Sequence, residues 1–348
     1  MGSDEVSRKD QSCELDLESL DKSTKTAEIN KDGAFKRQSN KFTTPFGSEP
    51  DELPVEAGRY RLLWTAACPW AHRTVIVRKL LGLEDVISLG TASPFRPKLN
   101  RVDWEFSLDE KSRDPILDIR YMSEIYHQTD PEYTGRPTVP VMVDLQTKKV
   151  VNNDYFKLTN YFETEWSPFH KEKAPDLYPE CLREEIDELN DLIFQDINNG
   201  VYKCGFALSQ DAYEQAYDQL FARLDELDER LSNQRFLHGD FITDSDVRFY
   251  TTLVRFDAAF YTAFNTNRTL IREFPHLSGY VRDLFQTPGF GDTTDFNAIK
   301  NHYHLSITIF TEKEDVKILP KGPDLSFWKS QHNRELLSKQ KEKFMIKK

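Results

Sequence analysis

The sequence of 348 residues has few cysteines and few basic side chains relative to its acidic ones. Its 4 cysteines are too few for a disulfide scaffold, and no two have CxxC spacing, which excludes a zinc ribbon and a dithiol redox motif. The 46 lysines and arginines are outnumbered by 58 aspartates and glutamates, so the formal net charge is -12. Because an acidic surface repels phosphate backbones, we expect no nucleic-acid partner.

Long apolar runs are also missing. No stretch of about 18 apolar residues occurs, so we expect no membrane-spanning helix. The opening letters MGSDEVSRKDQ contain no apolar core, so we expect no secretory signal and a cytoplasmic protein. Aromatic bulk is plentiful, with 24 phenylalanines, 14 tyrosines and 5 tryptophans, which is enough for a sizeable core. The length predicts about two domains.

Composition and periodicity divide the chain into four segments. Residues 1–55 are polar and carry proline and glycine near their end, which predicts an extended arm. Residues 56–166 carry strand and helix patterns in turn and predict one α/β domain. Residues 176–310 have helical periodicity and predict an all-helical domain. Residues 311–348 form a tail, whose basic end KQKEKFMIKK we interpret as a solvated helix face.

The α/β segment begins with a predicted strand, helix and strand. Residues 60–65 are aromatic and aliphatic, Pro69 suits the first position of a helix, and Gly82 suits its end. Residues 85–89 predict the second strand. This order favours a parallel strand pair.

The rest of this segment is less regular. Residues 91–135 are rich in loop residues, and residues 137–144 predict a strand interrupted by proline. A short strand at 149–151 could pair with it, and a helix is expected at 154–166.

The helical segment contains one specific start signal. Residues 213–231 place tyrosines and leucines at steps of three and four, as on one helix face. Further on, Thr243 and Asp246 form a candidate capping box, flanked by Ile242 and Val247 as a hydrophobic staple.

Cys68 stands where the first strand gives way to the helix. Unsatisfied N–H groups and the helix dipole at this position favour thiolate and predict a lowered pKa, to which His72 and Arg73 could add positive potential. The fourth position of the motif is Ala71, so an external thiol must release any disulfide formed on Cys68. The alternative is a buried cysteine that acts only as a small hydrophobic residue.

A Thr-Val-Pro run lies downstream, at residues 138–140. If the bond before Pro140 is cis, the backbone of Val139 would be open to pair with an extended thiol peptide. The alternative is an ordinary proline of an edge strand. Together with the strand, the Cys-Pro pair and the helix, this run favours thiol chemistry at Cys68.

Several motifs occur in an order that resembles one known family. They are ACPWAHR, GRPTVPV, NGVYKCGFA, LVRFDA, RDLFQTPGF and NHY, and they span about residues 58–310. This set is similar to the glutathionyl-hydroquinone reductases, also called Xi-class glutathione transferases. The resemblance implies the glutathione transferase fold, with an α/β thioredoxin-like N-terminal domain, an all-α C-terminal domain and usually a homodimer.

The resemblance also implies an activity, the reduction of glutathionyl-hydroquinones with glutathione as co-substrate. Cys68 would attack the sulfur that joins glutathione to the ring and form a mixed disulfide, which a second glutathione resolves. Tyr202 and Tyr303 match the family's catalytic tyrosines, whose phenols would assist the ring oxygen.

The resemblance further places the glutathione-binding residues. Trp104 matches a tryptophan that lies against the ligand, and Arg136 and Val139 flank the Thr-Val-Pro turn as carboxylate and backbone contacts. The family usually reads Asn-Asn-Glu-Ser-Ser where this chain has Asp154 and Tyr155 in place of Glu and the first Ser. Asp154 can still accept from the ligand's amino group, and Tyr155 keeps a backbone N–H. A related γ-glutamyl thiol therefore remains an alternative to glutathione.

The remaining histidines and cysteines give weaker evidence of function. His302 and His304 lack further ligands, so we expect no metal. We assign no role to Cys13, Cys181 or Cys204. Two other function classes stay open: another Cys-type glutathione transferase or thioltransferase, such as a dehalogenase, and a non-catalytic transferase-like binding module. A cysteine nucleophile disfavours conjugation, because it would be trapped as a mixed disulfide.

Overall fold

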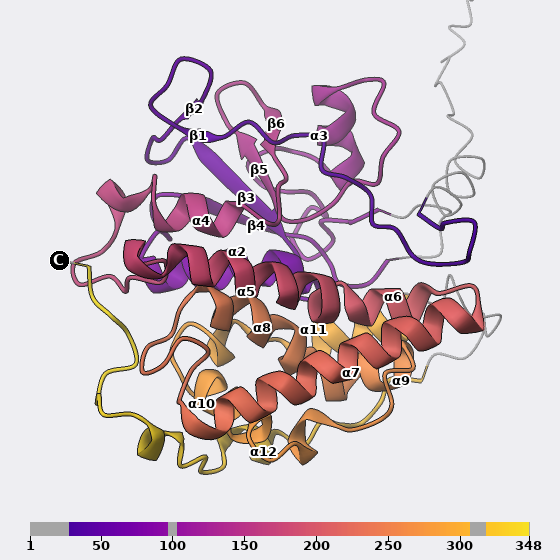
Figure 1. Ribbon diagram of the computed structural model, residues 1–348. Coiled ribbons are helices and arrows are strands. Elements are labelled where there is room, and N and C mark those ends of the chain that lie inside the picture. Colours follow the sequence, from indigo (N-terminus) through magenta and orange to yellow (C-terminus); the bar gives the residue numbers. More distant parts are fainter. Residues whose placement is uncertain (1–27, 97–102, 307–317, 348) are drawn as a thin grey trace, which may run out of the picture.

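The computed structural model describes residues 28–96, 103–306 and 318–347. A small sheet lies at one end of the molecule and a thick helical layer at the other (Figure 1). The sheet has the strand order β4-β3-β5-β6. Its strands are β3 (Tyr60–Trp64), β4 (Ser88–Thr91), β5 (Val141–Asp144) and β6 (Lys149–Asn152).

The pairing follows the predicted pattern. β3 and β4 are parallel, whereas β5 is antiparallel to both β3 and β6. The connection between the parallel strands is helix α2 (Pro69–Leu81), with Pro69 in its first turn and Gly82 in the left-handed conformation at φ 74° just after its end.

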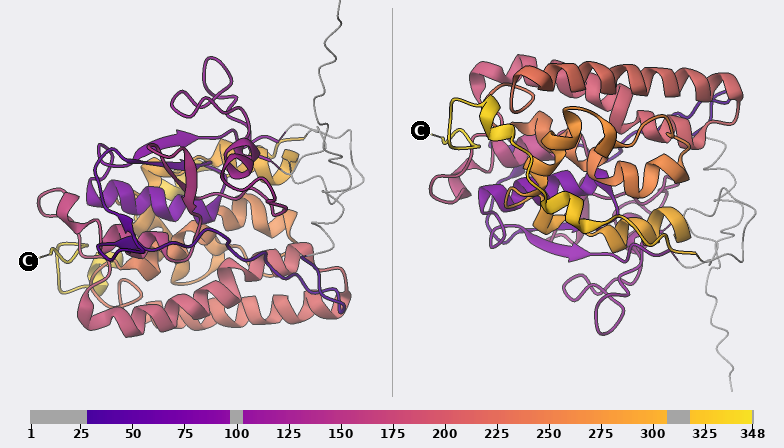
Figure 2. Two further views of the ribbon diagram at one scale, coloured as in Figure 1. Left: turned by 90° about the horizontal axis from the view of Figure 1, so that it is seen from above. Right: turned by 90° about the horizontal axis from the view of Figure 1, so that it is seen from below.

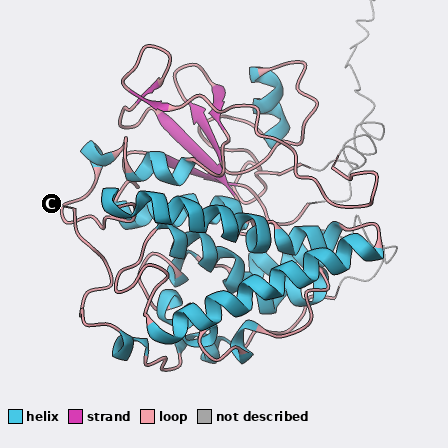
Figure 3. Cartoon of the chain, in the orientation of Figure 1, coloured by secondary structure: helices cyan, strands magenta, loops and turns pink. Residues whose placement is uncertain are grey.

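Helix α2 lies between the sheet and the helical layer (Figure 3). All of its residues are buried except Lys79. A helix buried on every side packs against neighbours on every side. Its N-terminus is therefore fixed by both halves of the molecule.

Four predictions for this half need correction. The strand expected at 85–89 begins only at Ser88, because residues 84–87 form a turn after Gly82. The strand expected at 137–144 begins at Val141, after the cis bond between Val139 and Pro140. The helix expected at 154–166 is reduced to α4 (Leu158–Glu163), and helix α3 (Met122–Thr129) lies in the stretch expected to be loop.

The other half is helical, as predicted. Its longest helix, α7 (Gln210–Asn233), buries the leucine stripe seen in the sequence. Helix α8 starts at the predicted capping box, in which the Asp246 carboxylate accepts from the N–H of Thr243 at 2.8 Å. The helices of this layer include α5 (Arg183–Ile193), α6 (Gly200–Phe206), α7, α8 (Asp244–Arg255), α9 (Tyr261–Ala263), α10 (Leu277–Phe285) and α11 (Phe296–Lys300).

The described part of the N-terminal arm, from residue 28, packs along both halves. It forms the short strands β1 (Phe46–Gly47) and β2 (Leu53–Pro54) near the sheet. Its other end reaches the α6–α7 connection, where Gly33 O accepts from Leu208 N at 2.9 Å. Figure 2 shows the indigo arm running from the sheet to the end of the long helix.

The C-terminal tail contradicts the expected solvated helix. Residues 338–347 contain no helix, and Ile346 forms an antiparallel bridge with Pro175. Upstream of this stretch lies helix α12 (Leu325–Lys329). The Lys343 ammonium pairs with the buried Asp283 at 2.7 Å. The basic end therefore returns to the protein surface and anchors there.

No helix among residues 28–96, 103–306 and 318–347 is long and apolar enough to span a bilayer.

Candidate functional site

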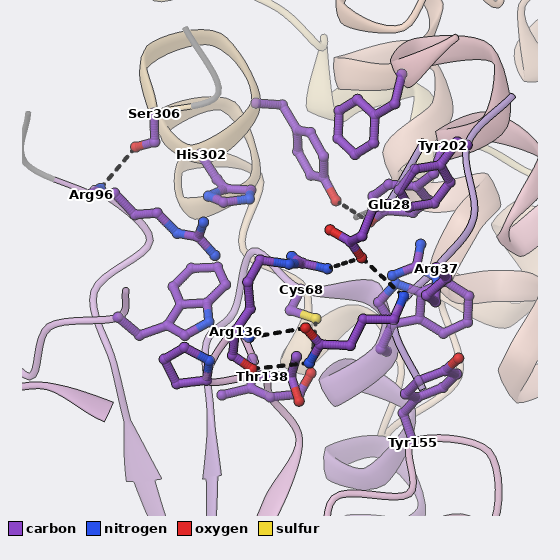
Figure 4. A pocket seen from close by; sticks show the side chains of 18 of the residues that line it. Glu28, Arg37, Cys68, Arg96, Arg136, Thr138, Tyr155, Tyr202, His302 and Ser306 are labelled. Atoms are coloured by element: carbon purple, nitrogen blue, oxygen red, sulfur yellow. Dashed lines mark hydrogen bonds and ion pairs between the residues drawn. The ribbon is translucent and has the colours of Figure 1, made fainter. Parts of the chain in front are cut away.

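Cys68 lies at the N-terminus of α2, at the bottom of a cavity of about 320 Å³ (Figure 4). The cavity wall comes from three parts of the chain: the N-terminal arm, the sheet half and the helical half. Cys68 is only 8% exposed, and its Sγ lies 3.5 Å from the carbonyl oxygen of Val139. The predicted strand-to-helix position of the thiol and its approach to the cis-proline turn are both present.

The electrostatics of Cys68 differ from the sequence prediction. Burial raises the pKa of the thiol above its ordinary value, and this effect exceeds the lowering by the N–H groups of Ala71 and Trp70 and by the guanidinium groups of Arg255 and Arg37. The helix N-terminus acts in the predicted direction, but the dry surroundings outweigh it.

His72 does not supply the charge expected of it, whereas the Arg73 cation interacts with Cys68 from outside the cavity lining. The His72 ring lies between Thr293 Oγ1 at 2.8 Å and Arg255 at 3.1 Å, and burial lowers its pKa well below the usual value, so the ring is neutral. Arg73 donates to Asn198 and does not line the cavity.

Arg255 reaches the loop before Cys68 from helix α8. Its guanidinium donates to the carbonyl oxygens of Ala67 at 3.0 Å and Ala66 at 2.9 Å. The helical half therefore holds the thiol loop of the sheet half in place, and it does so with a cation close to the sulfur.

Tyr202 and Tyr303 meet in the cavity wall, as the resemblance implied. Their hydroxyl oxygens are 2.7 Å apart, and one of them donates to the other. Tyr202 comes from α6 and Tyr303 from the helical turn after α11, 101 residues further on. Burial raises the pKa of both phenols, so both are protonated donors at neutral pH.

Trp104, Arg136 and Val139 line the same cavity. The Arg96 guanidinium lies over the Trp104 ring, 3.8 Å from the ring centre. The centres of the Trp104 and His302 rings are 5.1 Å apart. Arg136 pairs with Glu28 of the arm at 2.7 Å.

Asp154 and Tyr155 are placed differently from each other. The Tyr155 ring lines the cavity and lies tilted against the Trp70 ring, with 4.9 Å between the ring centres. Its N–H, expected to be open to a ligand, donates to Asn153 O at 2.9 Å. Asp154 is not part of the lining, because its carboxylate accepts from the N–H of Phe156 at 3.0 Å and from the side chain of Asn40.

Comparison with known proteins identifies the family. Residues 67–165 match the model of the glutathione S-transferase N-terminal domain, and residues 210–283 match that of the C-terminal domain. The chain is 37% identical to the glutathionyl-hydroquinone reductase of Escherichia coli over 281 residues, which cover 79% of this chain and 85% of that protein. This chain belongs to the Xi-class glutathione transferases.

Solved structures of glutathione transferases, one of them of the Xi class, agree with this assignment. The Xi-class enzyme of Phanerochaete chrysosporium is 40% identical, with a TM-score of 0.79 and coverage of 85% of this chain and 94% of that one. A glutathione transferase from Gordonia bronchialis is 52% identical, with a TM-score of 0.79 and coverage of 82% and 88%. The resemblance stated from the motifs and the predicted glutathione transferase fold are thereby confirmed.

Sequence reasoning missed the arm's part in this Xi-class site. Glu28, Arg37 and Gln38 line the cavity, although residues 1–55 were expected to form an extended arm with no site residue. Arg96, from the loop after β4, was also missed. The available signal was the segment GAFKRQ, where the aromatic Phe35 sits in a polar stretch. Phe35 is buried and packs on Phe206 beside the site.

The two histidines of the NHYH segment differ in their relation to the cavity, because His302 lines it and His304 does not. His302 and His304 each contact a backbone carbonyl, of Pro94 and Ala258 respectively. Within the described residues no group of three potential metal ligands occurs.

Two further cysteines are free thiols. Cys204 is buried, which raises its pKa to about 12, and Cys181 is exposed. Cys13 lies outside the described residues.

The raised pKa of Cys68 makes a direct prediction for the ligand-free transferase. The rate of alkylation by iodoacetamide should rise with pH through a midpoint above the ordinary thiol value of about 8.5, because burial favours the protonated form. Peptide-resolved mass spectrometry separates Cys68 from the exposed Cys181. A midpoint below the ordinary value would contradict the dominance of burial.

Proposed function

We propose that this transferase reduces glutathionyl-hydroquinones to hydroquinones, with glutathione as the reducing co-substrate. The observation that carries the proposal is one cavity that contains a single thiol and a pair of bonded phenols. Cys68 is the only cysteine among the described residues of the lining, and Tyr202 and Tyr303 share that lining. Curated relatives named glutathionyl-hydroquinone reductase, at 36% and 37% identity, support the same activity.

In the first half-reaction the Cys68 thiolate attacks the sulfur that joins glutathione to the ring. The substrate reacts as its keto tautomer, which carries a proton on the sulfur-bearing carbon. The new S–S bond forms, the C–S bond breaks, and its electron pair restores the aromatic ring. The oxygen on the neighbouring carbon becomes a phenolate oxygen and then takes a proton, so the hydroquinone leaves. Cys68 remains as a mixed disulfide with glutathione.

In the second half-reaction a glutathione thiolate attacks the mixed disulfide. Glutathione disulfide forms and the Cys68 thiolate is released. The two electrons that reduce the C–S bond thus come from two glutathione sulfurs. This sequence needs no second protein cysteine, which agrees with Ala71 at the fourth position of the motif.

Tyr202 and Tyr303 are proposed to stabilise the ring oxygen as its charge develops. Their phenols are held by each other at 2.7 Å inside a buried wall, so little reorganisation is needed when the charge appears. Both groups donate only while protonated, and the raised pKa of each keeps the proton in place.

Trp104, Arg136 and Val139 are proposed to hold the glutathione half of the substrate. The carbonyl of Val139 already lies beside the Cys68 sulfur, as pairing with an extended thiol peptide requires. Arg136 offers a cation for a carboxylate, and the ring of Tyr155 closes the wall near Trp70. We assign Asp154 a supporting role through Asn40, which lines the cavity.

We also propose a cytoplasmic homodimer. The resemblance to the Xi class implies the dimer, and a reducing glutathione pool is characteristic of the cytosol. Light scattering on the purified protein should give the mass of two chains, and the mass of one chain would contradict the proposal.

Replacement of the nucleophile tests the chemistry. Cys68→Ala should abolish reduction of S-(2,5-dihydroxyphenyl)glutathione, because Cys68 is the one thiol among the lining residues that the structure describes. Intact-protein mass spectrometry with glutathione disulfide should show an adduct on the native protein but not at position 68 of the variant. Cys181→Ala, which removes an exposed cysteine, is the matched control and should keep full turnover. Undiminished turnover in Cys68→Ala would refute the mechanism.

Removal of either phenolic hydroxyl tests the oxygen contact. Tyr202→Phe and Tyr303→Phe should each lower kcat by about 10²-fold, the usual effect of removing one donor to a developing oxyanion. Tyr213→Phe, which loses a hydroxyl bonded to Asn265 O outside the cavity, should leave kcat unchanged. Steady-state kinetics with the same conjugate provides the measurement, and equal rates in all three variants would exclude the proposed role.

A further inference from the structure

Arg37 of the N-terminal arm places a positive charge inside the cavity (Figure 4). Its guanidinium lies between two aromatic rings, 4.5 Å from the centre of Trp70 and 4.6 Å from that of Tyr202. Its Nε donates to the side-chain oxygen of Asn199 at 2.8 Å. The group is therefore held on three sides by stacking and one hydrogen bond.

One end of this guanidinium has no partner. The Nη2 atom of Arg37 is buried and makes no hydrogen bond within the described structure. The nearby Glu28 directs its Oε1 atom elsewhere, because this atom accepts from Arg136 at 2.7 Å and from the N–H of Gln38 at 3.0 Å. Arg37 forms no salt bridge with any described carboxylate.

Leaving such a donor unpaired is costly for the free protein. A buried charged donor without an acceptor loses its hydration and gains nothing in return. Burial accordingly lowers the pKa of Arg37. A site retains such a group where a ligand supplies the missing acceptor. The strongest such acceptor is an oxygen that carries negative charge or acquires it during the reaction.

The position of Arg37 indicates which part of the ligand it meets. Its guanidinium lies over the ring of Tyr202, and the hydroxyl of Tyr202 is hydrogen-bonded to that of Tyr303. Arg136, in contrast, lies two residues before the Thr-Val-Pro turn, whose Val139 carbonyl lies beside the Cys68 sulfur. Arg37 therefore lies with the phenols that face the aromatic half of the substrate.

We propose that Arg37 is a further catalytic residue, which binds the ring oxygen of the hydroquinone as the carbon–sulfur bond breaks. This inference rests on the proposed function and extends it to substrates with an oxygen on the carbon next to the sulfur-bearing one. The electron pair of the C–S bond moves through the ring to that oxygen, which becomes a phenolate. Nη2 of Arg37 donates to it, and the phenolate is then protonated to release the hydroquinone.

Two reactions on the same protein separate this role from others. Reduction of S-(2,5-dihydroxyphenyl)glutathione needs Cys68 and also a ring oxygen that takes up the charge when the C–S bond breaks. Glutathione-dependent reduction of bis(2-hydroxyethyl) disulfide needs Cys68 and glutathione but releases no ring. Arg37→Met should lower kcat of the first reaction by about 10²-fold, with a much smaller change in KM. It should lower the second by at most about tenfold, because the charge of Arg37 near Cys68 serves both reactions whereas the ring oxygen occurs in only one. Arg37→Lys keeps the charge but loses the planar fork, so its loss should be intermediate.

Arg268→Met is the matched control, because Arg268 also stacks on an aromatic ring, that of Phe221 at 4.4 Å, but does not line the cavity. Both of its reactions should stay at the native rate. The disulfide reaction also reports folding, so a variant that keeps it is folded at the thiol site.

An equal loss in both reactions would mean that Arg37 acts on the Cys68 thiol, on glutathione or on the fold, and would overturn the inference. Native rates of both reactions in Arg37→Met would overturn it as well. A native protein that reduces the disulfide but not the conjugate would refute the proposed function itself, and this result is read before any variant is compared.

Discussion

The bonds from Arg255 to the carbonyl oxygens of Ala66 and Ala67 couple the two halves of the molecule at the thiol. The thiol loop belongs to the sheet half, whereas Arg255 ends helix α8 of the helical half. Because its hydrogen bonds go to neutral carbonyls and not to a carboxylate, the charge of Arg255 is not cancelled locally. It can therefore oppose the burial of Cys68. Loss of this contact would free the loop that positions the sulfur, and it would also remove a charge that lowers the pKa of Cys68.

The cavity around the thiol is completed by the arm. Gln38 exchanges hydrogen bonds with the backbone of Arg136, accepting from its N–H at 2.9 Å and donating to its carbonyl at 3.1 Å. Phe35 packs on Phe206 of the helical half at 5.2 Å between ring centres. The arm thus contacts both halves across the cavity, and Arg37 enters between these two anchors. A segment without regular secondary structure thus contributes the cation that stacks between Trp70 and Tyr202.

Local rules explain which features could be predicted. Pro69, Gly82 and the Thr243–Asp246 box act within a few residues of their own position, so the start or end of a helix could be derived from them. The sulfur position followed from the same rules. The direction of its pKa did not, because that depends on how much water is removed by residues from the whole chain. The Tyr202–Tyr303 pair joins residues far apart in the chain, and only the family resemblance indicated it.

The same distinction explains the arm. Residues 28–40 satisfy no helix or strand period, and their order comes from contacts made with surfaces that the sequence of the arm does not contain. The position of the Arg37 side chain is fixed by its contacts with Trp70, Asn199 and Tyr202, which all lie outside the arm. The helix and strand propensities of the arm's own residues therefore do not predict the conformation that the arm adopts.

In the proposed reaction, negative charge leaves the sulfur of Cys68 and reaches the ring oxygen of the substrate. A cation near only one of these atoms would stabilise either the start or the end of the step and would hinder the other. Arg37 lowers the pKa of Cys68 and also stacks on Tyr202, so its field covers both ends of the transfer. Burial keeps the thiol mostly protonated, which raises the energy of the thiolate relative to that of the bound oxyanion. The same dry environment strengthens the bond from Nη2 to that oxyanion. The unpaired guanidinium and the raised pKa of the thiol, which are both unfavourable in the free protein, therefore act in the same direction once charge moves from sulfur to oxygen.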